Sequence, residues 1–192
     1  GRAEHAALLN CRTLEHRQVP LYLGGCVLLL CDTGVRHELG DTEYAKRQEE
    51  CARALDAVRR EIGPHIADLG MLGVEDYRKA APAMDDVAAR RARHAVTENA
   101  RVLRSVDALE RSDLVDLGAQ LSASHASLRD DYEVSCPELD LVAEAAVEQA
   151  GVLGARMVGG GFGGCVLALA ERERVDEIEK ALQARYAETG KA

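Results

Sequence analysis

The chain has 192 residues, enough for one domain with a sizeable hydrophobic core. Apolar residues make up 47% and charged residues 30%, as in ordinary globular proteins, and the net charge of −9 argues against a nucleic-acid partner. No apolar run is long enough to cross a bilayer, so neither a membrane partner nor a secretory leader is expected.

Short apolar runs over residues 6–11 and 18–21 predict two edge strands. The next run, over residues 26–31, is continuously apolar and predicts a buried strand, followed by a turn at Asp32-Thr33-Gly34. Thr42 is then predicted to cap a helix over residues 43–62, which Gly63-Pro64 ends. Charges on the outer face of that helix are interpreted as solvated: Lys46, Glu49, Arg53 and Arg60.

Helical periodicity continues over residues 84–109 and again from Ser112-Asp113. The pattern Ser135-x-x-Glu138 predicts a capping box for a helix that runs to about Ala150. Strands are predicted over residues 154–158 and 164–170, and a last amphipathic helix over 173–187. This order predicts an α+β fold of the ferredoxin-like split βαβ type, with a helical insertion and with its final strand missing. That strand would pair beside residues 26–32.

A glycine-rich loop joins the last two predicted strands. Five of its six residues are glycine: Gly159, Gly160, Gly161, Phe162, Gly163 and Gly164. The letters match the dinucleotide-binding pattern G-x-G-x-x-G, but an apolar strand-like run follows instead of a helix. A P-loop needs Lys followed by Ser or Thr, and Cys165-Val166 stands there instead. We interpret the loop as a hairpin connection that lets a ligand or another backbone come close, because a simple turn needs only one or two glycines.

Two residues beside predicted element ends leave two interpretations open. Asp32 ends a strand, where sheet-borne sites often lie, but it can equally cap the following turn. Tyr44 lies in the first turn of a predicted helix, where a phenol can point its hydroxyl at a ligand or simply pack in the core.

The remaining polar candidates favour structural interpretations. Asp130-Asp131 invites a metal site, but a solvated turn between helices is preferred, and no metal is expected. His94 and His125 have no partner at ligand spacing and are predicted at the surface or the edge of the core. Six cysteines form no C-x-x-C pair and are expected to be reduced thiols of a cytoplasmic protein: Cys11, Cys26, Cys31, Cys51, Cys136 and Cys165.

Longer motifs carry a resemblance to a known family. The segment SHASLRDDYEVSCPELD at residues 124–140 and the segment GARMVGGGFGGC at residues 154–165 resemble the galactokinases. The second segment is similar to the third motif shared by the galacto-, homoserine, mevalonate and phosphomevalonate (GHMP) kinases. Stretches at residues 11–15, 31–39 and 43–51 agree in order and spacing, so the resemblance covers nearly the whole chain.

The resemblance implies a two-domain enzyme that uses ATP and Mg²⁺ to phosphorylate the anomeric C1 hydroxyl of galactose. Residues 1–25 would be the tail of the N-terminal kinase domain, and residues 26–192 the C-terminal domain. The phosphate loop, the magnesium ligands and the catalytic aspartate are expected upstream of Gly1, so this chain alone is expected to be inactive. Tyr44 would contact the sugar, and the loop Gly159–Gly164 would line the cleft. No Lys or Arg of this chain is expected to hold phosphate.

Two alternatives stay open on the sequence. A non-catalytic galactokinase-like sensor would bind galactose and ATP without turnover, and a related kinase would act on N-acetylgalactosamine. Both differ from a galactokinase mainly in residues of the N-terminal domain, so the sequence upstream of Gly1 would decide between them.

Overall fold

The structure is a computed structural model that describes residues 2–36 and 40–190. Residues 37–39, which belong to one of the family-like stretches, lie outside the described residues. The strands are β1 (His5–Leu9), β2 (His16–Pro20), β3 (Cys26–Asp32), β4 (Val152–Val158) and β5 (Cys165–Glu171). The helices are α1 (Gly40–Glu61), α2 (Val74–Ala80), α3 (Asp86–Glu110), α4 (Leu114–Asp130), α5 (Pro137–Val147) and α6 (Val175–Ala187).

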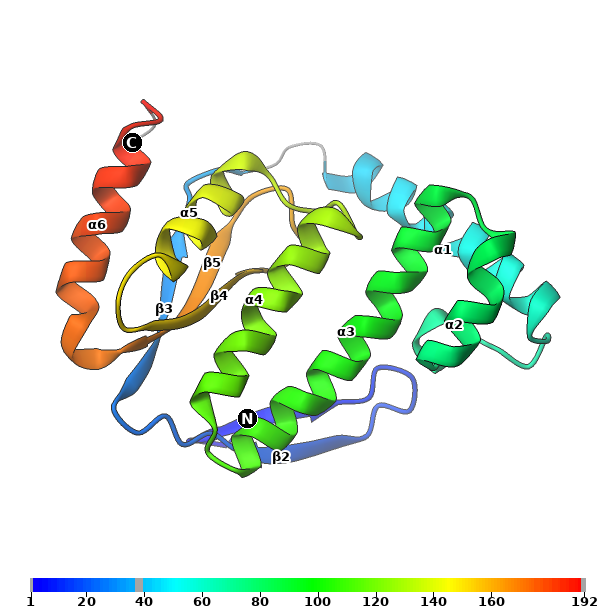
Figure 1. Cartoon of the computed structure of the whole chain (residues 1–192), viewed down its shortest axis with the longest axis horizontal. Helices are drawn as coiled ribbons and strands as arrows, with labels where there is room; N and C mark the ends of the chain where they lie inside the picture. Colours follow the sequence, from blue (N-terminus) through cyan, green and yellow to red (C-terminus); the bar gives the residue numbers. More distant parts are fainter. Residues whose placement is uncertain (1, 37–39, 191–192) are drawn as a thin grey trace.

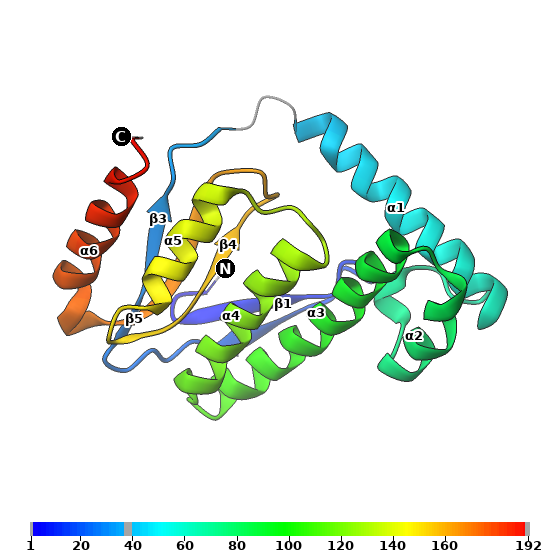
Figure 2. The same cartoon turned by 45° about the horizontal axis from the view of Figure 1, so that its top comes forward.

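The main sheet has the order β3-β5-β4, and both pairs are antiparallel. The split βαβ arrangement predicts this order, because the second strand of the β4–β5 hairpin, β5, lies between β3 and β4. Within residues 2–36 and 40–190, β3 pairs only with β5, so its other side is a free edge, where the absent strand was predicted to pair. Helices α4 and α5 pack against β4, and α6 lies beside α5 (Figures 1 and 2).

Strand β3 corrects one prediction. Its apolar run was expected to be buried, but alternate residues face outward, and Leu30 is 64% exposed. The inward residues Leu29 and Cys31 pack against the core beneath the sheet. A continuous apolar run does not reveal that the outward face of the sheet stays open at Leu28 and Leu30.

The helical insertion extends away from the sheet, with α1 and α2 packed on α3 (Figure 1). It has a hydrophobic core of its own, which includes Ala54, Val58, Leu72, Ala92 and Val96. The β1–β2 hairpin forms a separate two-stranded sheet that lies along α3. Among the described residues, none of the helices is long and apolar enough to cross a membrane.

Helix α4 and strand β4 touch backbone to backbone at two glycines. A Cβ atom on Gly154 would lie 1.9 Å from the carbonyl oxygen of Gly118, so neither position has room for a side chain. Glycine inside a helix is usually unfavourable by about 1 kcal/mol relative to alanine, so Gly118 is explained by this close approach.

Two predicted helix starts are wrong. Helix α1 begins at Gly40, two residues before the predicted cap. The predicted capping box of α5 does not form, because the N-cap residue is Cys136 and no side chain caps the helix. The hydroxyl of Ser135 donates instead to the carboxylate of Asp140 at 2.5 Å.

Candidate functional site

The glycine loop joins β4 to β5 as a hairpin, as predicted, and its backbone explains its composition. Four glycines have positive φ angles: Gly159 (95°), Gly161 (91°), Gly163 (142°) and Gly164 (94°). Phe162 adopts a φ of 59°, which is uncommon for a residue with a side chain. The loop is therefore a specifically folded segment, and its shape depends on residues that tolerate left-handed backbone.

Two of the glycines also let the loop dock against neighbouring backbone. A Cβ atom on Gly161 would lie 2.3 Å from the carbonyl oxygen of Val134, and one on Gly163 would lie 2.7 Å from that of Val35. The same two carbonyls accept hydrogen bonds from the loop, from the Phe162 N–H at 2.7 Å and the Gly164 N–H at 3.0 Å. The loop is thus clamped between the segments that follow α4 and β3.

Tyr44 and the loop line one cavity of about 490 Å³. Its other lining residues come from the segment after β3 and from the start of α1: Val35, Arg36, Ala45 and Gln48. Tyr44 is 48% exposed, so it is not a core tyrosine. All the predicted loop residues line the cavity except Gly159. The structure therefore brings the two predicted site elements together, although more than 100 residues separate them in the sequence.

Arg36 was missed by the sequence analysis, which expected no cation of this chain at the cleft. Arg36 lines the cavity, and its guanidinium forms a two-armed ion pair with Asp32, at 2.9 and 2.7 Å. Asp32 also accepts the Gly34 N–H at 2.9 Å, so the turn-capping interpretation of Asp32 is confirmed. Hydrogen bonds from Arg36, then from Gly34, hold the pKa of Asp32 well below its usual range. The four-residue spacing from Asp32 to Arg36 was the available signal.

A hydrogen bond from α6 supports this corner from behind. The hydroxyl of Tyr186 donates to the Thr33 carbonyl at 2.6 Å, and the hydroxyl of Thr33 donates to the Gly164 carbonyl at 2.7 Å. Helix α6 therefore holds the turn that precedes Arg36. That turn also holds the end of the glycine loop.

The prediction of a solvated turn at Asp130-Asp131 is wrong for one of the two residues. Asp130 is exposed, but Asp131 is only 8% exposed. Its carboxylate pairs with Arg93 and accepts the Ser127 hydroxyl at 3.1 Å. Among residues 2–36 and 40–190, no group of three or more His, Cys, Asp or Glu side chains is arranged to hold a metal ion.

Both candidate histidines are buried and serve the fold. His94 stacks on Tyr132 with 4.6 Å between ring centroids, and burial above all lowers its pKa to about 4. The Nδ1 atom of His125 accepts the Met157 N–H at 3.2 Å, so its neutral form carries the proton on Nε2, 3.4 Å from Asp140. Burial likewise lowers the pKa of His125. Neither ring lines the cavity that contains Tyr44.

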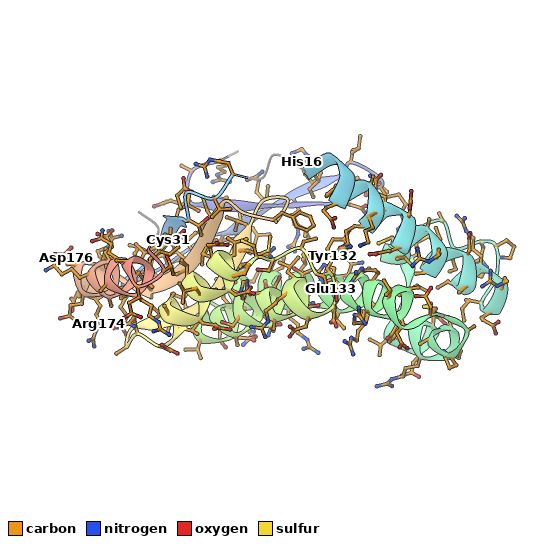
Figure 3. The ribbon with its side chains drawn as sticks, turned by 90° about the horizontal axis from the view of Figure 1, so that it is seen from above. His16, Cys31, Tyr132, Glu133, Arg174 and Asp176 are labelled. Carbon is orange, nitrogen blue, oxygen red and sulfur yellow. The ribbon has the colours of Figure 1, made fainter. Side chains whose placement is uncertain are left out.

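A largely buried ionic cluster links α1, α3 and the segment after α4, and its members do not line the cavity. Arg91, 1% exposed, donates to the carboxylates of Glu50 at 2.7 Å and Glu133 at 2.6 Å. Arg47 donates to the same Glu50 oxygen at 3.0 Å. Burial raises the pKa of Glu50, but the two arginines outweigh it and lower that pKa overall. Figure 3 labels Glu133 near the centre of the molecule, beside α1 and α3.

Comparison with known proteins places this architecture in a class. Residues 105–188 match the family described as GHMP kinases C terminal. Residues 105–188 therefore resemble the C-terminal domain of the GHMP kinases, in agreement with the fold that the sequence predicted.

Within that class, the chain is similar to galactokinases. It is 43% identical to the galactokinase of Staphylococcus carnosus over 97% of this chain and 48% of that protein. It is 41% identical to that of Thermotoga neapolitana over 97% of this chain and 50% of that protein. The crystal structure of Lactococcus lactis galactokinase complexed with galactose matches with a TM-score of 0.93 and 39% identity, over 98% of this chain and 48% of that one. The resemblance to galactokinases is confirmed, and the chain spans about half the length of the curated relatives it matches.

Proposed function

We propose that this chain is the C-terminal part of a galactokinase, which transfers the γ-phosphoryl group of ATP to the C1 hydroxyl of galactose. The products are galactose 1-phosphate and ADP. The supporting observation is that Tyr44, Arg36 and the glycine loop line the same cavity. It occurs in a chain that is 39% identical to a galactokinase whose structure contains galactose.

The lining residues suit both groups that react, the sugar and the phosphate. Tyr44 offers a phenol that both donates and accepts hydrogen bonds, and its half-exposed position leaves the hydroxyl available to a sugar. The backbone of the glycine loop allows a ligand to approach closely. Arg36 lies in the same wall, and its guanidinium, although paired with Asp32, has further N–H donors that an anionic phosphate could accept. Phosphoryl transfer depends mainly on positioning and charge stabilisation, and these residues would provide part of both.

Other parts of the machinery are assigned to the rest of the whole protein. ATP supplies the phosphoryl group, and Mg²⁺ would neutralise its phosphates. We assign the magnesium ligands, most ATP contacts and the catalytic aspartate to an N-terminal domain, the expected protein partner of this chain. Residues 1–25 would be the tail of that domain, because their hairpin forms its own sheet, and residues 26–192 would be the C-terminal domain. The cysteines of the described chain are all free, which supports a cytoplasmic location.

The test uses the full-length protein that contains this chain. ADP release is measured with galactose and with N-acetylgalactosamine, for the wild type and for Tyr44→Phe. Loss of one sugar hydrogen bond, about 0.5–1.5 kcal/mol, should raise the KM for galactose about two- to tenfold. Tyr22→Phe is the matched control, because Tyr22 is exposed and does not line the cavity.

The outcomes separate the alternatives. Galactose-dependent ADP release with a raised KM in Tyr44→Phe supports the proposal. Galactose binding without turnover would identify a sensor, and preference for N-acetylgalactosamine would identify the related kinase. If Tyr44→Phe and Tyr22→Phe behave alike, Tyr44 does not contact the sugar.

A further inference from the structure

Arg47 lies on α1 three residues after Tyr44, so the two side chains occupy neighbouring positions on one side of the helix. Unlike Tyr44, Arg47 is buried, and it does not line the cavity. Its guanidinium carbon lies 5.9 Å from the centre of the Phe162 ring, within the range of a cation–π interaction. Arg47 therefore links the helix that carries Tyr44 to the glycine loop.

A second contact strengthens this link through the segment after α4. Arg47 donates to the carbonyl oxygen of Glu133 at 2.7 Å. The next carbonyl, that of Val134, accepts the Phe162 N–H at 2.7 Å. Helix α1 and the glycine loop thus donate hydrogen bonds to the carbonyls of two consecutive residues, Glu133 and Val134. Glu133 itself has a φ of 55°, so this backbone is held in a sparsely populated conformation that its contacts must maintain.

The ionic cluster does not depend on Arg47 alone. Glu50 also accepts a hydrogen bond from Arg91 at 2.7 Å, so removing Arg47 leaves this buried carboxylate paired. Arg91 likewise keeps its bond to the Glu133 carboxylate. A substitution of Arg47 therefore loosens the link between α1 and the loop, and it leaves Glu50 with one buried arginine partner instead of two.

We infer that Arg47 is a positioning residue, which fixes Tyr44 and the glycine loop on opposite sides of the cavity at the separation that the reaction needs. This inference rests on the proposed function, since the reaction is the one proposed above. Arg47 acts through Phe162 and the backbone of residues 133–134, and it does not contact the substrate. Its planar guanidinium suits this role, because it can bind a carbonyl along its edge and stack on a ring with its face.

The test compares Arg47→Met and Arg47→Lys in the full-length protein. The matched control is Arg53→Met, because Arg53 lies on the same helix but is exposed and pairs only with Asp85, at 3.3 Å, among the described residues. Arg47→Met should lower kcat/KM for galactose about 10- to 100-fold, as expected when reacting groups are misplaced by about 1 Å. Arg47→Lys should recover part of this loss, because it keeps a cation near Phe162 but lacks the planar fork. Arg53→Met should leave kcat/KM unchanged.

Amide hydrogen exchange supplies a readout that does not need the reaction. In Arg47→Met the peptide covering residues 158–166 should exchange faster than in wild type, while peptides from the core of α3 keep their protection. Arg53→Met should leave the loop peptide unchanged. Should Arg47→Met fail to fold, the same comparison is made with Arg47→Lys.

The two readouts keep the two proposals distinguishable. A wild-type protein without kinase activity would refute the proposed function, and loop exchange would then test the role of Arg47 alone. Unchanged loop exchange in the Arg47 variants would overturn the positioning role. So would faster loop exchange with wild-type kcat/KM in an active enzyme.

Discussion

Replacing Gly161 by alanine tests whether the glycine loop is held by its contact with Val134. Gly161 has a φ of 91°, and an added Cβ would lie 2.3 Å from the Val134 carbonyl oxygen and 2.8 Å from the Val134 Cβ. Neither neighbour is the free end of a flexible side chain. The loop must therefore either strain or withdraw from Val134, and withdrawal breaks the hydrogen bond that the Phe162 N–H makes there.

Two energy terms set the expected loss of unfolding free energy in Gly161→Ala: backbone strain and overpacking. Left-handed backbone is unfavourable by about 1–2 kcal/mol for a residue with a Cβ. Overpacking against a well-packed neighbour adds about 1–3 kcal/mol. The sum of about 2–5 kcal/mol is an upper limit, because a surface loop can relax by moving out. Domains of this size have unfolding free energies of about 5–15 kcal/mol, so we expect the protein to stay folded while the cavity wall is displaced.

The assay is urea unfolding together with ADP release in the full-length protein. Gly160→Ala is the control for stability, since a Cβ there meets nothing within 4 Å. Gly25→Ala is the control for activity, because Gly25 also has open space and does not line the cavity. Gly161→Ala should lower both the unfolding free energy and kcat/KM, and the bulkier Gly161→Val should do so further. If Gly161→Ala is as stable as Gly160→Ala and as active as Gly25→Ala, the loop is a passive turn.

Three further perturbations test the core that supports the site. Gly118→Ala should lower the unfolding free energy by about 3 kcal/mol in urea, because its Cβ would lie 2.2 Å from the Leu153 carbonyl oxygen. The pKa of His94 is about 4 in the fold, below the ordinary histidine value of 6.5, so the unfolded chain binds more protons between these values. The contribution of neutral His94 to the unfolding free energy should be fully present above pH 6.5 and should fall by up to about 3 kcal/mol on acidification towards pH 4. In urea titrations at each pH, His94→Gln should make this dependence on pH shallower. Arg91→Met should cost about 3 kcal/mol in the same assay, because Glu50 and Glu133 each lose a buried partner, whereas Arg53→Met should be near neutral.

Elements with strong periodicity or unusual composition could be predicted from the sequence. Helix α3 was expected over residues 84–109 and spans Asp86–Glu110. The glycine density alone identified the hairpin loop, because that many glycines require special backbone or close contact. For Tyr44 the sequence left a ligand contact and a core position open, and its exposure excludes the core position. These signals are local, so a window of neighbouring residues is enough to detect them.

Residues whose role depends on distant partners could not be predicted. Lys46, Glu49, Arg53 and Arg60 are exposed, as the charge pattern of α1 indicated. Arg47 and Glu50 lie among them in the sequence but point inward. The reason is Arg91, which comes 41 residues after Glu50 and supplies the partner that makes its burial favourable. Helical periodicity in charged residues carries no information on such a partner.

The site lies between two of the hydrophobic cores, and this explains which contacts matter there. One core packs α5 and α6 against the sheet, and the other packs α1 and α2 on α3. Residues 131–134 join the two cores near the site, with Tyr132 stacked on His94 of α3 and the Val134 carbonyl holding the glycine loop. A third hydrophobic core joins α3 and α4 to β3 and β5, so burial also holds the two cores together. Near the site, the hydrogen bonds and ring contacts of residues 131–134 specify distances and angles. Substitutions at this junction should therefore change the geometry of the cavity, and with it activity, by more than their effect on stability would suggest.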